Sequence, residues 1–375
     1  MLAFGKLSVL EVCAVLGGRM TELESPSERI CTLRSSSASS AAPNIAGIHK
    51  FASVLTRVQP DGAGTEGFVE KVSDRVDELS NLSVSAYGVP EDDYESVLQL
   101  LLGAFRTRGF RKIHLLRPKG NELHAEQVVA RGATDVIVFP YRGAFCLGLT
   151  SYVPEASDFR ERGVAKPAPH SDISLSPRLA RVLVNLTGIR RGQTLLDPFC
   201  GSGTILAEGM LKSIRCFGID SRRRLIDEAR RNLRWISDQS RGTYFKLRAG
   251  DARDLGATLG GMLVDGVATE PILLPKLQGR LNSGAAKELV EGAGDVYAEA
   301  LASIAGVVKP GGRVVIVVPI IQTTDDSEIY VGLDGRPLGL KPFQPGPSPF
   351  QYPVRLSFES TRWIKRAVYV FEVPP

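Results

Sequence analysis

Residues 194–204 read TLLDPFCGSGT, an apolar run that ends in an acid and leads into two glycines separated by one serine. A short apolar run before a glycine-rich turn is typical of a buried strand that passes into a helix. Glycine lets the backbone adopt conformations denied to other residues and lets a ligand approach closely. This stretch therefore predicts a ligand-binding turn at the end of a buried strand.

The chemistry of the turn narrows the class of ligand. Loops that bind a dinucleotide pyrophosphate follow the pattern G-x-G-x-x-G/A, whereas here the third position is Leu206. Asp197, just before the glycines, would repel a pyrophosphate and suits a ligand with a positive amino group. We therefore predict S-adenosylmethionine (SAM), with a nucleotide redox cofactor or a purely structural turn as the alternatives.

Downstream of residue 190 the chain alternates between strand and helix patterns. Apolar strand-like runs stand at 214–219, 244–247, 263–267 and 314–318, and a helical apolar stripe covers 221–236. This alternation is typical of a parallel sheet with helices on both faces, whose ligands bind at the carboxyl ends of the strands. We expect a Rossmann-like α/β domain.

Further acids follow the later strands. Asp220 lies about 20 residues after the glycine loop, where an acid accepts hydrogen bonds from ribose hydroxyls. Asp251 follows the next strand and is predicted to accept from an adenine amino group. Each acid also has a plainer interpretation, because Asp220 suits the dipole at a helix start and Asp251 suits a turn.

The fourth strand ends in Thr269, Glu270 and Pro271. An exocyclic base amine is a weak nucleophile because its lone pair is delocalised into the ring. Two acceptors that hold both N–H groups direct this lone pair at a methyl donor, which is catalysis by positioning. We predict that Glu270 and the carbonyl of Pro271 are these acceptors, with an ordinary strand-end turn as the alternative.

The N-terminal part reads as a separate α+β region. Ser8 and Glu11 have the spacing of a helix capping box. Helical and strand-like apolar patterns alternate over 68–149, and residues 152–176 have the proline and charge content of a linker. Basic residues between a predicted helix and strand, and in the linker, are candidates for phosphate contacts, although a solvated helix end is the alternative; they are Arg106, Arg108, Arg111, Lys112, Arg160 and Arg162.

Bulk composition agrees with a globular protein. The chain is 43% hydrophobic and 23% charged, and no apolar run approaches the ~18 residues of a membrane span. We therefore expect a soluble cytoplasmic protein with no membrane partner. The net charge of +5 favours a polyanionic partner. Five cysteines without a C-x-x-C motif and four scattered histidines predict neither a disulfide framework nor a metal site.

Four motifs together resemble one family, the tRNA guanine-N2 methyltransferases, of which the archaeal enzymes acting at position 10 are the best known. These motifs are SLSPRLAR at 174–181, DPFCGSGT at 197–204, NLRW at 232–235 and KPGG at 309–312. The resemblance is specific over 174–320 and weak over 20–150. It departs from the family at 270–273, where Glu-Pro-Ile-Leu replaces the usual Asp/Asn-Pro-Pro-Tyr/Phe.

The resemblance implies a division of the chain into a ferredoxin-like α+β subdomain at 1–60, a THUMP-like RNA-binding domain at 61–151, a linker at 152–176 and a Rossmann-like methyltransferase domain at 177–375. It also implies SAM as the cofactor, a tRNA or another structured RNA as the partner, and leaves open a small activator subunit. The residues that it assigns to the cofactor are Ser174, Pro177, Asp197, Phe199, Gly201, Gly203, Asp220 and Asp251.

Three functions remain open at this point. The first is transfer of a methyl group from SAM to an exocyclic base amine, N2 of a guanosine in tRNA. The second is methylation of a DNA base or a protein amide, because the same acceptor geometry serves any planar amine. The third is SAM or RNA binding without turnover, for which the altered motif at Glu270 is the motivation.

Overall fold

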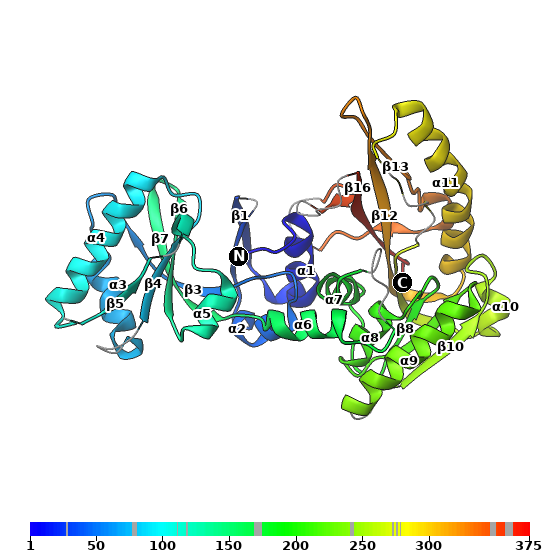
Figure 1. The fold of residues 1–375 in the computed structure, drawn as a ribbon, viewed down its shortest axis with the longest axis horizontal. Coiled ribbons are helices and arrows are strands. Elements are labelled where there is room, and N and C mark those ends of the chain that lie inside the picture. Colours follow the sequence, from blue (N-terminus) through cyan, green and yellow to red (C-terminus); the bar gives the residue numbers. More distant parts are fainter. Residues whose placement is uncertain are drawn as a thin grey trace. The chain divides into compact units, whose positions relative to one another are not determined.

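The computed structural model describes residues 1–27, 29–76, 81–110, 112–117, 119–168, 175–240, 244–271, 274, 277, 279–345, 350–356 and 363–375. Contacts within the chain define two compact units. Unit 1 holds residues 1–3, 18–44 and 48–156, and unit 2 holds residues 4–17, 45–47 and 157–375. Figure 1 shows both units, and each is described by itself below.

Unit 1 is built on a five-stranded sheet of order β3-β7-β6-β4-β5. The pairs β3–β7 and β7–β6 are antiparallel, whereas β6–β4 and β4–β5 are parallel. A separate antiparallel pair is formed by β1 and β2. The strands are β1 (Glu22–Ser27), β2 (Ile30–Arg34), β3 (Phe51–Val58), β4 (Asn81–Ala86), β5 (His114–Leu116), β6 (Thr134–Tyr141) and β7 (Ala144–Tyr152). The helices are α2 (Ala38–Ala41), α3 (Thr65–Val72), α4 (Glu91–Thr107) and α5 (Ala125–Ala130).

Apolar residues at helical spacing explain why α3 and α4 cover this sheet. Phe68 and Val72 of α3, with Leu98 and Phe105 of α4, form a core with strand residues such as Val136. All are buried. The amphipathic stripe of each helix is therefore matched to one face of the sheet.

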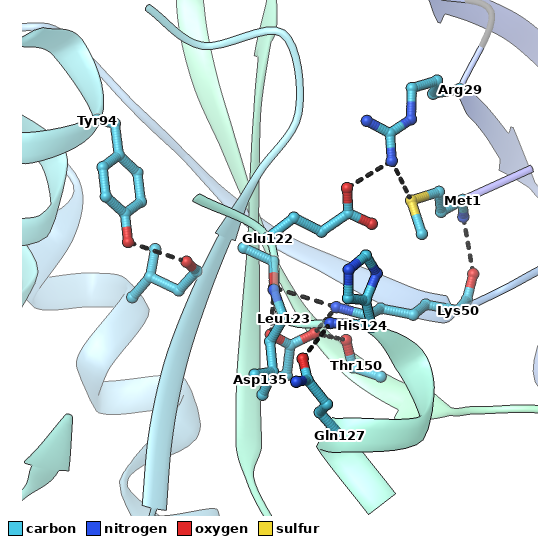
Figure 2. A network of polar contacts seen from close by, with 12 residues as sticks. Met1, Arg29, Lys50, Tyr94, Glu122, Leu123, His124, Gln127, Asp135 and Thr150 are labelled. Atoms are coloured by element: carbon cyan, nitrogen blue, oxygen red, sulfur yellow. Dashed lines mark hydrogen bonds and ion pairs between the residues drawn. The ribbon is translucent and has the colours of Figure 1, made fainter. Parts of the chain in front are cut away.

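The other side of this sheet contains a buried polar network (Figure 2). Lys50 Nζ lies 2.8 Å from Asp135 Oδ2, and both side chains are fully buried. The hydroxyls of Ser85 and Thr150 donate to the same carboxylate. Both carboxylate oxygens of Asp135 therefore accept hydrogen bonds, which a buried charge requires.

Unit 2 is a doubly covered sheet of order β10-β9-β8-β11-β12-β16-β14. Strands β10, β9, β8, β11 and β12 are parallel, and β16 runs antiparallel to β12. The strands are β8 (Thr194–Asp197), β9 (Arg215–Asp220), β10 (Tyr244–Ala249), β11 (Val264–Thr269), β12 (Val308–Gln322), β13 (Glu328–Tyr330), β14 (Lys341–Pro342), β15 (Val354–Arg355) and β16 (Ile364–Glu372). The helices are α1 (Lys6–Leu16), α6 (Ala156–Val164), α7 (Pro177–Leu186), α8 (Thr204–Met210), α9 (Arg223–Gln239), α10 (Leu255–Leu259) and α11 (Ser283–Ala305).

Two apolar cores lie on opposite faces of this sheet. One holds buried residues of α1, α7, α8 and α9, such as Leu183 and Leu233, and the other holds residues of α10 and α11, such as Leu301. Figure 1 shows α11 along one side of β12. The Rossmann-like α/β fold predicted from the strand–helix alternation is confirmed.

Three local expectations differ from the structure. Helix α1 begins at Lys6, and Glu11 does not cap it but accepts hydrogen bonds from the amides of Ala46 and Gly47. The predicted capping box is therefore wrong, because the carboxylate of Glu11 binds residues far away in sequence instead of the start of its own helix.

The segment 152–176 contains helix α6, whose Phe159 packs against a core of unit 2. Helix α1 lies in unit 2, whereas we assigned 1–60 to one subdomain. The domain assignments, including the THUMP-like region, stay predictions.

Candidate active site

The carboxyl end of β8 is the place where the strand order of unit 2 reverses. Strand β9 lies on one side of β8 and β11 on the other. Open α/β sheets bind their ligands at this position, since the connections leave the strands in opposite directions. Asp197 ends β8 and Thr269 ends β11, so the cofactor acid and the amine motif predicted from the sequence meet here.

Asp197 is almost completely buried at 2% exposure. Its Oδ1 accepts from the hydroxyl of Thr269 at 2.6 Å and from the amide of Phe199 at 3.2 Å. Burial, together with the negative charges of Asp220 and Glu270, raises the pKa of Asp197 to about 7, although these two hydrogen bonds lower it. The three acids predicted to surround the ligand therefore share one electrostatic environment.

The glycine loop is fixed by Asp220. Its Oδ2 accepts from the amide of Gly201 at 3.0 Å, and its Oδ1 accepts from the amide of Arg222 at 2.9 Å. Gly201 has φ 50° and Gly203 has φ 88°, a left-handed conformation that strains any residue with a side chain. Asp220 thus shapes the cradle, and its predicted contact with a ribose stays a prediction.

Asp251 lies next to this cradle but points partly into solvent. The amide of Gly250 donates to the carbonyl of Asp220 at 3.2 Å. The Asp251 side chain is 44% exposed and pairs with Arg253 at 2.7 Å, which lowers its pKa. To accept from an adenine amino group, Asp251 would share its carboxylate with this arginine.

The segment before α7 borders the loop from another direction. Pro177 begins α7, and the hydroxyl of Ser176 accepts from the amide of Leu179, which caps the helix. Pro177 lines a hollow together with Ser202 and Gly203. Ser174 lies outside the described residues.

Glu270 and Pro271 already have partners from distant elements. A carboxylate oxygen of Glu270, Oε1, accepts from Nε of Arg366 on β16, and the Glu270 side chain is 12% exposed. The carbonyl of Pro271 accepts from the hydroxyl of Tyr297 at 2.7 Å. Both predicted acceptors therefore lie just after the end of β11, and each has a partner from another element.

The predicted RNA-binding cations divide between the two units. Arg106 and Lys112 are exposed in unit 1, and Arg108 pairs with Glu70 at 3.0 Å. Arg160 is exposed in unit 2, and Arg111 lies outside the described residues.

Arg162, the remaining cation of this set, is largely withdrawn from solvent. Its Nε lies 2.7 Å from Oε1 of Glu208, a carboxylate that is 1% exposed, and its guanidinium stacks on Phe159. The contact gives Arg162 a partner within unit 2, and its predicted RNA contact stays a prediction.

Four residues that shape this site were assigned no role in it from the sequence. Thr269 joins the two strand ends, and Tyr297 and Arg366 hold the amine motif. Asn232, of the NLRW motif, accepts from the amide of Ala168 and donates to the carbonyls of Ala168 and Ser202, so it ties the glycine loop to the chain before α7. One signal was available, since a tyrosine in an apolar helical stripe needs a partner for its hydroxyl.

The arrangement fits a cationic nucleoside. Within the described ranges, no group of three or more His, Cys, Asp or Glu side chains is placed to hold a metal ion. The left-handed glycines leave backbone accessible, and the buried acid at the end of β8 complements a positive amino group.

None of the described helices has both the length and the apolar character of a membrane span.

Comparisons with known proteins define the class of unit 2. Residues 169–319 match the family of methyltransferase domains described as UPF0020, RMKL-like. The fold of the whole chain resembles the crystal structure of TrmN from Thermus thermophilus, with a TM-score of 0.52, 18% sequence identity, and coverage of 100% of this chain and 98% of that one. The protein therefore contains a methyltransferase domain.

Two relatives indicate which class of methyltransferase the chain resembles. The chain is 41% identical over 98 residues to the tRNA (guanine(10)-N2)-dimethyltransferase of Methanothermobacter thermautotrophicus, covering 26% of this chain and 27% of that protein. It is 29% identical over 154 residues to the enzyme of the same name from Pyrococcus abyssi, covering 40% and 45%. The chain thus spans less than half the length of these two relatives. The resemblance to tRNA guanine-N2 methyltransferases, predicted from the motifs, is confirmed over this part of the chain.

Proposed function

We propose that this protein is a SAM-dependent RNA methyltransferase that methylates an exocyclic base amine, N2 of a guanosine in tRNA. The observation that carries the proposal is the 2.6 Å hydrogen bond between Thr269 and Asp197. It joins the end of the strand that precedes the glycine loop to the turn that presents Glu270. One carboxylate for a cationic cofactor and one for an amine are thereby set side by side.

In this proposal Asp197 faces the amino group of the cofactor, and Gly201 and Gly203 line it with backbone. When bound, SAM supplies an electrophilic methyl group on a positively charged sulfur. Glu270 accepts one N–H of the guanine amine and the Pro271 carbonyl accepts the other, which directs the nitrogen lone pair at the methyl carbon. The nitrogen–carbon bond forms as the carbon–sulfur bond breaks, and the surplus amine proton leaves to Glu270 or to water.

The remaining assignments of the proposal concern the N-terminal part and the location. We infer that residues 61–151 form a THUMP-like RNA-binding region and that the exposed cations Arg106, Arg108 and Lys112 contact phosphates. Phosphate contacts make the affinity fall as salt concentration rises. We infer that the protein acts in the cytoplasm.

The test is transfer of labelled methyl from SAM to unmodified tRNA by the full chain. We expect label in tRNA and none in duplex DNA offered in parallel. Glu270→Gln keeps the size of the side chain but removes its charge, and it should lower kcat by about 100-fold with KM for SAM unchanged. Absence of label from every RNA, or undiminished turnover by Glu270→Gln, would overturn the proposal.

A further inference from the structure

The turn that carries Glu270 and Pro271 is held by two side chains that come from elements far along the chain. Arg366 lies on β16 and reaches Glu270 across 96 positions of sequence. Tyr297 lies on α11 and reaches Pro271 across 26 positions. Each contact falls on one of the two groups that we propose as acceptors for the substrate amine, the carboxylate of Glu270 and the carbonyl of Pro271.

Sheet register explains how Arg366 arrives at this turn. Thr269 of β11 pairs with Ile316 of β12, and Pro319, three residues further along β12, pairs with Arg366 of β16. Arg366 therefore stands beyond the carboxyl end of β11, where the chain has just turned. Its side chain is 20% exposed and that of Glu270 is 12% exposed, so the pair is screened only weakly by solvent.

Tyr297 reaches the turn from helix α11. It lies in the apolar core formed by α11 and the sheet, with 0% exposure. Its hydroxyl donates to the Pro271 carbonyl at 2.7 Å. Burial and the charge of Glu270 both raise the pKa of Tyr297, so the hydroxyl stays a hydrogen-bond donor at any physiological pH.

We propose that Arg366 and Tyr297 are positioning residues, which aim the two amine acceptors of the Glu270–Pro271 turn; the inference rests on the proposed function. Glutamate has one more rotatable bond than the aspartate of the related motif, and the hydrogen bond from Arg366 to Oε1 restricts that freedom and fixes the carboxylate of Glu270. A carbonyl oxygen has two lone pairs, so Tyr297 fixes Pro271 and leaves one lone pair for the substrate.

Loss of a positioning residue and loss of a merely structural residue change different kinetic quantities. Loss of packing or stability lowers the amount of folded enzyme and weakens cofactor binding together with turnover. Misplacement of the two amine acceptors lowers kcat while KM for SAM is retained, since the proposed cofactor contacts of Asp197 and the glycine loop are unchanged. A misplacement of about 1 Å at the reacting atoms lowers the rate by up to about 100-fold.

The variants are Arg366→Gln and Tyr297→Phe, each with a matched control in the same unit. Lys365→Gln removes the neighbouring cation of β16, whose partner is Glu328. Tyr369→Phe removes another buried hydroxyl, which accepts from the amide of Leu333. We expect kcat for tRNA methylation to fall about 100-fold in Arg366→Gln and about 10-fold in Tyr297→Phe, with KM for SAM unchanged and both controls near wild type.

Arg366→Lys retains the charge without the planar guanidinium and should recover part of the loss. Equal kcat in the test variants and their controls would overturn the inference, as would a rise in KM for SAM that accounts for the whole effect.

Hydrogen–deuterium exchange on the full chain separates this inference from the proposed function. We expect faster exchange in the peptide 266–271 of Arg366→Gln and Tyr297→Phe than in the two controls. If wild-type protein transfers no methyl to RNA, the proposed function fails, and the exchange comparison alone decides whether the two side chains hold the turn. Unchanged exchange in both variants would show that they do not.

Discussion

At the scale of single residues, Asp197 occupies a costly position for a carboxylate, because it is buried and two other acids lie nearby. In the free protein, burial and the neighbouring acids favour the protonated form of Asp197, whereas a bound ammonium group stabilises the charged form. Asp197 is thus suited to a cationic ligand, which is the physical reason for its place before the glycine loop.

SAM affinity should therefore depend on pH through Asp197. Its pKa of about 7 in the free protein means that the acid is protonated below pH 7 and must lose its proton when the ammonium binds. Affinity should rise with pH by up to about 10-fold per unit between about pH 5.5 and 7, and Asp197→Asn should bind weakly without this slope. Calorimetric titration of SAM at several pH values measures both, and a flat wild-type profile would exclude this role for Asp197.

The sequence showed Asp197, Asp220 and Glu270 because each follows an apolar strand, and the ends of parallel strands meet at one edge. It gave no sign of Arg366, since only the antiparallel pairing of β12 with β16 brings that residue to Glu270. It assigned Glu11 to a local cap, although Ala46 and Gly47 are its partners. Local spacing predicts local contacts well, and long-range pairing depends on topology that spacing does not contain.

At the scale of elements, the sheet of unit 1 is joined by the buried pair of Lys50 and Asp135 (Figure 2). Lys50 precedes β3, and Asp135 lies on β6, with Ser85 of β4 and Thr150 of β7 on the same carboxylate. The network therefore ties three strands and the entry to a fourth into one register.

Breaking this pair from one side should destabilise unit 1. Lys50→Met leaves the buried carboxylate of Asp135 without its cation, which costs about 3 to 5 kcal/mol in comparable cases. Urea unfolding of the full chain, followed by a probe in unit 1, measures the change. Arg34→Met, which removes an exposed ion pair with Glu22, should leave the midpoint unchanged. An equal response of the two variants would mean that the buried pair does not stabilise this sheet.

At the scale of the whole molecule, helix α1 belongs to unit 2, which contains the methyltransferase domain, although it lies far from that domain in sequence. Leu7 and Leu10 of α1 lie in the same core as Leu183 of α7. The buried carboxylate of Glu11 accepts from the amides of Ala46 and Gly47 and from the side chain of Asn185. Unit 2 is therefore assembled from three separate stretches of sequence.

Glu11→Ala should accordingly weaken unit 2, although Glu11 lies far from the glycine loop in sequence. The substitution removes the acceptor of the two buried amides of Ala46 and Gly47 and one acceptor of the Asn185 side chain, and each buried amide left unpaired costs about 1 to 3 kcal/mol. Chemical unfolding followed in unit 2 should show a loss of at least about 2 kcal/mol, whereas Glu288→Ala, at an exposed position of α11, serves as the neutral control. Equal stability of the two variants would show that the contacts of Glu11 do not stabilise this unit.

Mass spectrometry of tRNA nucleosides from cells that lack this protein tests the central claim most directly. The account predicts that N2-methylated guanosine decreases, that the wild-type chain restores it, and that Glu270→Gln expressed at the same level does not. Unchanged N2-methylated guanosine in the deficient cells, or full restoration by Glu270→Gln, would contradict the account.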